Sequence, residues 1–195
     1  MKILRPLSGR HAAARLVTAV ALSLVTGLTP VHAQKRSVHD TREQATQALF
    51  DQGVAAANQN DDKTALTIYE QVAQRYGKGS PPAMRTLAAK ALLNKGGILG
   101  EQGDAKGAIA TYQRLDLRFG QDKDQAIREV VASALVSKAE ASYKQGDAKA
   151  AVATYEQIEK RFAKDGSSFI RQLVAITKWR TAEILADSAA LSSRR

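Results

Sequence analysis

The sequence contains no cysteine, so it can form no disulfide, carries no thiol nucleophile and has no site for a lipid anchor on cysteine. Histidine is almost as scarce: the three histidines are His11, His32 and His39, all near the N-terminus. Without cysteine or histidine in the rest of the chain, the common zinc sites and the Cys–His and Ser–His catalytic pairs are excluded there.

Other enzymatic signals are also missing. No glycine-rich phosphate-binding loop is present, because Gly96-Gly97 falls inside an expected helix. An active site made of carboxylates alone stays open as a third hypothesis, although no motif marks one. The sequence therefore predicts a protein that is not an enzyme, and it indicates no metal and no cofactor.

The formal net charge of +10 comes from basic residues that are spread over the whole chain. A nucleic-acid-binding protein would gather them in one patch, so we expect no nucleic-acid partner. For an exported protein this charge favours solubility, and it adds at most a weak attraction to anionic membrane surfaces.

The first 33 residues have the pattern of a secretory signal peptide. A basic start that includes Lys2 and Arg5 precedes an apolar run from Leu16 to Leu28, and Val31-His32-Ala33 offers small residues for cleavage after Ala33. The run is shorter than the roughly 20 residues that span a bilayer. An uncleaved anchor or a buried helix is the alternative. Export without cysteine fits the bacterial envelope, so we expect the chain in the periplasm or secreted.

The chain repeats itself with a period of 43 residues. Tyr69, Tyr112 and Tyr155 each begin a related segment that ends in an arginine, an aromatic residue and a small residue. Residues 84–126 and 127–169 share 17 identities in 43 positions. A fixed period in this range is the signature of a solenoid, in which each unit buries its apolar face against the next.

Each unit is predicted to contain two helices. In the second helix the apolar residues recur at helical spacing, as in Ala108, Ile109, Tyr112, Leu115 and Phe119. The first helix is longer, and in the second repeat it is expected from about Pro81 to Gln102 with Ser80 as its N-cap.

The turn between the two helices has its own signature. Asn60, Gly103 and Gly146 tolerate the left-handed conformation that ends a helix. The aspartates that follow them, Asp61, Asp104 and Asp147, are expected to cap the next helix.

These residues resemble the tetratricopeptide repeat, which pairs a large residue, a leucine, a glycine and an aromatic on the first helix with an alanine and an aromatic on the second. The second repeat matches with Leu92, Gly96, Leu99, Ala108 and Tyr112. The period departs from the usual one of about 34 residues. A glycine or alanine replaces the usual closing proline, and polar residues replace the leucine before the glycine. The positions of that leucine are Gln52, Lys95, Lys138 and Thr181.

The resemblance implies an all-α solenoid of three helix pairs plus a terminal helix over residues 41–188. Residues 1–33 are expected to be the signal peptide, 34–40 a disordered tail and 189–195 a C-terminal tail. The lysines of the polar column either extend along their stems to water or form a polar seam in the solenoid.

Residues one step from the core stripe are expected to line a concave surface that binds a peptide or protein. Alternatively, the same residues pack against neighbouring helices. The candidate residues for partner binding are Phe50, Lys90, Leu93, Val136, Ile176 and Trp179.

A column of arginines at the same period suggests an alternative site for anions. A row of guanidinium groups could hold carboxylates or phosphates, or each could pair with an acidic neighbour in the next repeat. The residues of this arginine column are Arg42, Arg85, Arg128 and Arg171. A parallel column consists of Arg75, Arg118 and Arg161.

The sequence as a whole predicts a non-catalytic scaffold for protein–protein interaction in the bacterial cell envelope. The runner-up function is the binding of an anionic envelope glycan or lipid head group through the arginine column. Neither the identity of the partner nor the oligomeric state follows from the sequence.

Overall fold

The computed structural model describes residues 31–77 and 79–192. Seven α-helices follow one another there: α1 (Val31–Asn58), α2 (Asp62–Arg75), α3 (Pro82–Glu101), α4 (Ala105–Phe119), α5 (Gln125–Lys144), α6 (Ala148–Phe162) and α7 (Ser168–Ser192). The expected all-α solenoid of three helix pairs and a final helix is confirmed. None of the described helices is long and apolar enough to cross a membrane.

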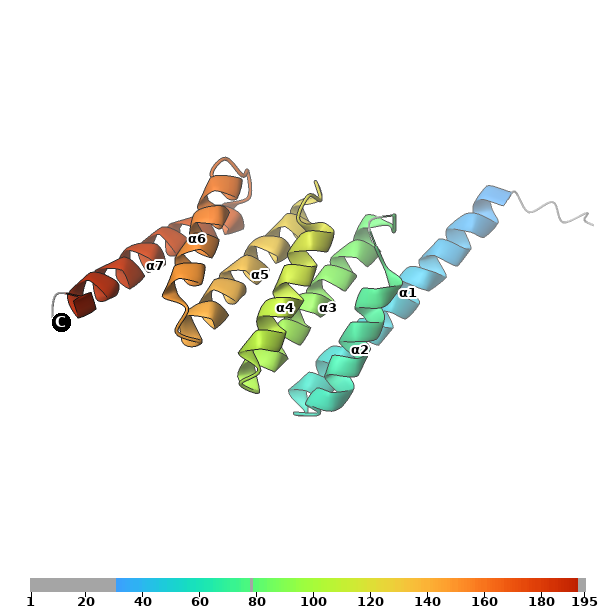
Figure 1. Ribbon diagram of the computed structural model, residues 1–195. Coiled ribbons are helices and arrows are strands. Elements are labelled where there is room, and N and C mark those ends of the chain that lie inside the picture. The colour runs from blue at the N-terminus through green and yellow to red at the C-terminus, as the bar shows by residue number, and fades with distance from the viewer. Residues whose placement is uncertain (1–30, 78, 193–195) are drawn as a thin grey trace, which may run out of the picture.

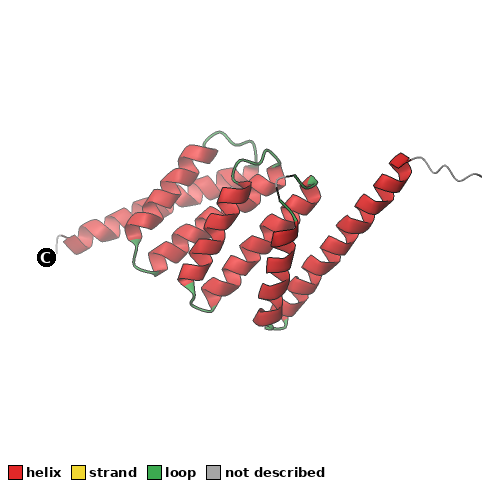
Figure 2. Ribbon diagram, turned by 45° about the vertical axis from the view of Figure 1, so that its right-hand side comes forward, coloured by secondary structure: helices red, strands yellow, loops and turns green. Residues whose placement is uncertain are grey.

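The helices form two layers, with α1, α3, α5 and α7 in one and α2, α4 and α6 in the other (Figure 1). Each helix packs against its neighbours in sequence, and each odd-numbered helix also contacts the next odd-numbered one. Within the described residues, the backbones of the even-numbered helices do not come close to one another. Because the odd-numbered layer is the more closely spaced, it forms the inner, concave side of the solenoid. The early part of α1 stands apart from the other helices (Figure 2).

The turns within the helix pairs have the predicted geometry. Asn60, Gly103 and Gly146 adopt left-handed backbone with φ of 60°, 81° and 85°. In the second repeat, the N–H of Gly103 donates to the carbonyl of Gly100 and the N–H of Asp104 to that of Leu99, which closes a Schellman motif. The carboxylates of Asp61, Asp104 and Asp147 then accept from backbone N–H groups in the first turn of the next helix.

The start of α3 differs from the prediction. Ser80 is not its N-cap, because the helix begins at Pro82 and Pro81 occupies the cap position without a side-chain hydrogen bond. A residue before proline is restricted to extended backbone, and Pro81 accordingly has ψ of 150°. The helix therefore cannot include Pro81.

The predicted tails are shorter than expected. Residues 34–40 belong to α1, and α7 continues to Ser192, which includes most of 189–195. Both segments are polar, but neither contains proline or glycine, and many of their residues have adequate helix propensity. A helix that packs in the core can therefore extend through them. The predicted signal peptide falls mostly on residues 1–30, outside the described residues, and it stays a prediction.

The core lies between the two layers. Tyr69, Tyr112 and Tyr155 are buried at equivalent places, as are Phe119 and Phe162. The rings of Tyr69 and Tyr112 each lie against a glycine of the preceding first helix. Gly53 and Gly96 are so close to Tyr69 and Tyr112 that an added Cβ would approach a ring carbon to 2.9 and 2.4 Å. The expected core role of the aromatic stripe is confirmed.

Two adjacent glycines of α3 provide a test of this packing. Gly96→Ala should lower the free energy of unfolding by about 1–2 kcal/mol, because its methyl group would collide with the Tyr112 ring. Gly97→Ala should raise it by about 0.5–1 kcal/mol, because a Cβ at Gly97 meets nothing within 4 Å and alanine favours the helix. Urea denaturation measures both, and equal effects of the two substitutions would contradict this packing.

Candidate binding surfaces

The concave side carries a groove over α1, α3 and α5. One hollow in this groove measures about 540 Å³ and is lined by residues of these helices together with Tyr69 and Tyr112. A second hollow of about 230 Å³ continues it between α3 and α5. Gly97 borders both hollows, and Gly100 borders the second. Because these two glycines have no side chains, the groove is deeper at its middle.

The floor of the groove is polar where the tyrosine hydroxyls reach it. Asn94 Nδ2 donates to the Tyr69 hydroxyl over 3.2 Å, and Ser137 is a hydrogen-bond partner of the Tyr112 hydroxyl. Burial raises the pKa of Tyr112 above its usual value. At the equivalent place in the third repeat, the Tyr155 hydroxyl donates to Glu140. Glu140 in turn accepts two hydrogen bonds of 2.9 Å from Arg180.

The column Asn94, Ser137 and Arg180 was missed in the sequence. These residues recur at the 43-residue period and each faces the tyrosine of the preceding helix pair. The signal was present, since all three are polar at one register of the first helices. It was obscured because the three residue types differ.

The predicted partner-binding residues divide into two groups. Phe50, Leu93 and Val136 are half-buried, and the ring of Phe50 lies 5.8 Å from that of Tyr69. These three residues therefore pack against the core as well as bordering the concave side. Trp179 and Ile176 on α7 are 63% and 49% exposed.

Lys90 lies on the exposed inner side of α3. It lines a further hollow of about 620 Å³ between α1 and α3, together with Gln47 and Asp51. The structure thus places all six predicted residues on the odd-numbered helices. Of these six residues, Lys90 and Leu93 each line one of the hollows described above, and the other four line none of them.

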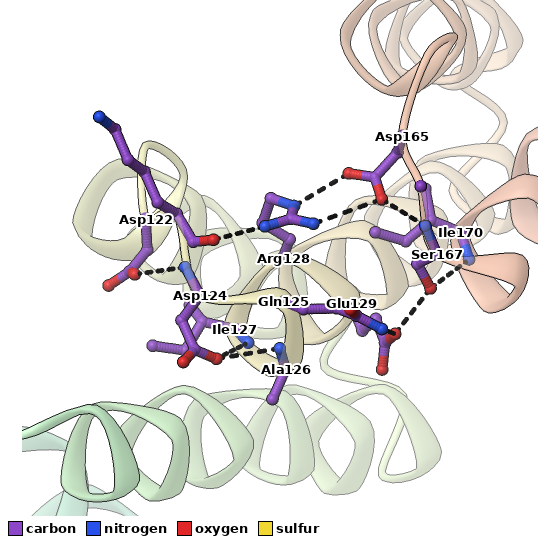
Figure 3. Close-up of polar contacts among 12 residues, drawn as sticks. Asp122, Asp124, Gln125, Ala126, Ile127, Arg128, Glu129, Asp165, Ser167 and Ile170 are labelled. Carbon is purple, nitrogen blue, oxygen red and sulfur yellow. Dashed lines mark hydrogen bonds and ion pairs between the residues drawn. The ribbon is translucent and has the colours of Figure 1, made fainter.

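The arginine column lies along one edge of the solenoid, and its two central members are paired. Arg85 Nε donates to Asp122 over 2.7 Å and Arg128 Nε donates to Asp165 over 2.9 Å. Figure 3 shows Arg128 of α5 reaching the aspartate in the loop before α7. The Arg128 guanidinium lowers the pKa of Asp165. Arg171 is exposed and donates to the Gly166 carbonyl, whereas Arg42 is exposed without such a bond.

The second arginine column holds successive even-numbered helices together. Arg118 of α4 donates to the carbonyls of Ala73 and Tyr76 over 2.5 and 2.6 Å. Arg161 of α6 donates to Asp116 of α4 over 2.6 Å. These long side chains bridge the spacing between helices whose backbones do not touch.

In the polar column of Gln52, Lys95, Lys138 and Thr181, the lysine at position 95 forms an ion pair. Lys95 Nζ donates to Glu70 over 2.7 Å, and Arg114 donates to both carboxylate oxygens of Glu70 over 3.0 and 2.8 Å. Arg114, followed by Lys95, lowers the pKa of Glu70 to about 2 against the opposing effect of burial. Lys95 therefore forms an ion pair rather than extending its ammonium group to water. Gln52 is exposed, while Lys138 and Thr181 are half-buried.

In the part of the chain that the structure covers, no group of three or more histidines, cysteines, aspartates or glutamates is placed to hold a metal ion. The carboxylates of Glu70, Asp165 and Glu140 each form an ion pair with a lysine or arginine. The fold and these surfaces define a helical-repeat protein with a continuous inner face.

Comparison with known families specifies the class of repeat. The profile of the tetratricopeptide repeat family matches residues 47–78 and 133–165, which correspond to the first and third helix pairs. The chain contains tetratricopeptide repeats, as the sequence resemblance predicted. No curated protein matches the chain. Tetratricopeptide repeats generally mediate protein–protein interaction and are typically non-catalytic.

Acid titration tests the Glu70 cluster. Because the pKa of Glu70 in the fold is about 2 against an ordinary 4.5, its carboxylate stabilises the fold fully above about pH 4.5, and this contribution falls as the pH approaches 2. Glu70→Gln should cost on the order of 1 kcal/mol at pH 6, since the cluster is partly solvated. The difference from wild type should shrink between pH 4.5 and 2, as measured by urea denaturation.

Glu156 supplies the control because it occupies the equivalent position on α6 and is exposed. Glu156→Gln should change the stability at pH 6 by no more than about 0.5 kcal/mol. If the stability of Glu70→Gln ran parallel to that of wild type over the whole pH range, the assigned role of the cluster would be wrong.

Proposed function

We propose that this protein is a non-catalytic scaffold of the bacterial cell envelope that binds a protein or peptide on its concave, odd-numbered layer. The groove over α1, α3 and α5 is the observation that carries the proposal. It is continuous over three helices, it combines apolar walls at Val54 and Leu93 with polar groups at Asn94 and Ser137, and glycine deepens its centre.

The dimensions of the groove favour a peptide segment over a small molecule. The hollows are open and follow one another along the layer, whereas a small-molecule site is usually one enclosed cleft. Alternating apolar walls and hydrogen-bonding groups suit an extended or helical segment. The exposed Trp179 and Ile176 extend the apolar surface onto α7, where a longer partner would reach them.

The runner-up function, binding of an anionic glycan or lipid along the whole arginine column, has less support. A continuous anionic ligand needs free guanidinium groups at each step. Arg85 and Arg128 already hold carboxylates of the chain itself, so an anion would have to displace Asp122 and Asp165.

Blocking the groove tests the proposal. Gly97→Gln places a long side chain in the centre of the groove, at a position where the backbone has room for it and where glutamine favours the helix. Affinity capture from envelope extract should lose the partner that wild-type protein retains, and titration of that purified partner should show at least a tenfold weaker Kd.

The matched control is Ala110→Gln on the exposed side of α4. This variant adds the same side chain to the even-numbered layer and should bind the partner as wild type does. Equal binding by both variants would exclude the groove as the binding surface.

The envelope location rests on the basic start, the apolar run and the cleavage pattern of residues 1–33. N-terminal sequencing of protein recovered from the periplasm or medium should begin at Gln34. A full-length chain starting at Met1 and confined to the cytoplasm would contradict export.

A further inference from the structure

The repeats contain two internal examples of carboxylate binding at one place in the solenoid. Arg85 holds Asp122 through Nε at 2.7 Å and through its second terminal nitrogen at 3.1 Å. Arg128 holds Asp165 in the same two-pronged way, at 2.9 and 3.5 Å. In both cases the arginine is 37 residues before the aspartate, which lies in the loop that leads to the next first helix.

The first repeat has the arginine of this pair but lacks the aspartate. Arg42 occupies the register of Arg85 and Arg128, and the residue 37 positions later is Gly79. Among the described residues, the side chain of Arg42 makes no ion pair and no hydrogen bond, and it is exposed.

A second arginine is free at the same place. Arg75 has the register of Arg118 and Arg161, which donate to the preceding even-numbered helix. The structure describes no helix pair before α1, and Arg75 has no partner within the described residues. In the described chain, Arg42 thus lacks a partner because Gly79 stands in place of the aspartate, and Arg75 lacks one because no helix pair is described before α1.

The two free arginines line a single hollow of about 610 Å³. Tyr76, Gly79 and Ser80 contribute to its wall, and none of the described residues that line it is acidic. Two guanidinium groups at one hollow raise the local positive potential, and the planar fork of arginine matches a carboxylate. The hollow shares Met84 with the hollow beside Lys90, but it shares no lining residue with the two hollows of the groove that contain Gly97.

We propose that the Arg42–Arg75 hollow binds a carboxylate of a partner protein, supplied by an acidic segment. The partner's carboxylate takes the position that the side chains of Asp122 and Asp165 fill in the later repeats. The chain thereby has a second contact for a partner, specific for acidic residues and located at the α1 end of the solenoid.

The test restores the missing aspartate. A Cβ at Gly79 would meet nothing within 4 Å, and the backbone of Gly79 is outside the left-handed region, so Gly79→Asp is sterically compatible with the fold. The probe is an acetylated, amidated peptide of four glutamates flanked by alanines, titrated against the chain lacking residues 1–33 at low salt. The NMR signal of Arg42 Nε–Hε reports occupancy.

Wild-type protein should bind this peptide, and a peptide with glutamine in place of glutamate should not bind. Gly79→Asp and Arg42→Gln should each weaken binding at least tenfold. Gly79→Asp should also raise the denaturation midpoint, as expected if its carboxylate is held by Arg42. The matched control Gly166→Asp adds the same charge at an exposed glycine with equal room and should leave binding unchanged.

Three results would overturn the proposal. One is undiminished binding of the acidic peptide by Gly79→Asp, and another is an equal loss of binding in Gly166→Asp. The third is displacement of the peptide by inorganic phosphate at equimolar concentration, which would identify a general anion site. None of these results bears on the concave groove. Conversely, Gly97→Gln, which tests the groove, leaves Arg42 and Arg75 intact.

Discussion

The contact between a tyrosine ring and the small residue beneath it determines how closely the two helices of each pair approach. Tyr69 lies on Gly53, Tyr112 on Gly96, and Ala139 has the equivalent place below Tyr155. At Gly53 and Gly96 an added side chain would collide with the tyrosine ring. Because the tyrosine also crosses the layer, its hydroxyl reaches the concave side. The same contact therefore builds the core and provides the polar floor of the groove.

Ionic side chains connect parts of the solenoid that apolar side chains do not join. In the described chain the backbones of the even-numbered helices do not come close to one another, and Arg114, Arg118 and Arg161 bridge these helices through carboxylates or backbone carbonyls. Partly solvated ion pairs contribute little energy one by one, so their effect is mainly to fix the register between neighbours.

Most of the architecture could be predicted because certain residue types recur at positions where the fold requires them. The left-handed turns at Gly103 and Gly146 and the caps at Asp104 and Asp147 followed from the period, as did the buried aromatic stripe. The pairing of Arg128 with Asp165 was one of two open alternatives, because the sequence alone does not show which loop lies beside which helix. The sequence did not predict that Gly97 deepens the groove, because a glycine within a helix does not by itself indicate a hollow. For the same reason it did not predict the contact of Gly96 with Tyr112. The polar composition of 34–40 predicts a disordered tail, whereas these residues belong to α1.

The most direct test of this account is a double-mutant cycle between Gly96 and Tyr112. If the ring and the glycine are in steric contact, the effect of Gly96→Ala on the free energy of unfolding must depend on Tyr112. In a Tyr112→Ala background, Gly96→Ala should be neutral or stabilising, which gives a coupling energy of about 1–3 kcal/mol. An identical loss of stability in both backgrounds would show that the two residues act independently, and would contradict the contact on which the core and the groove depend.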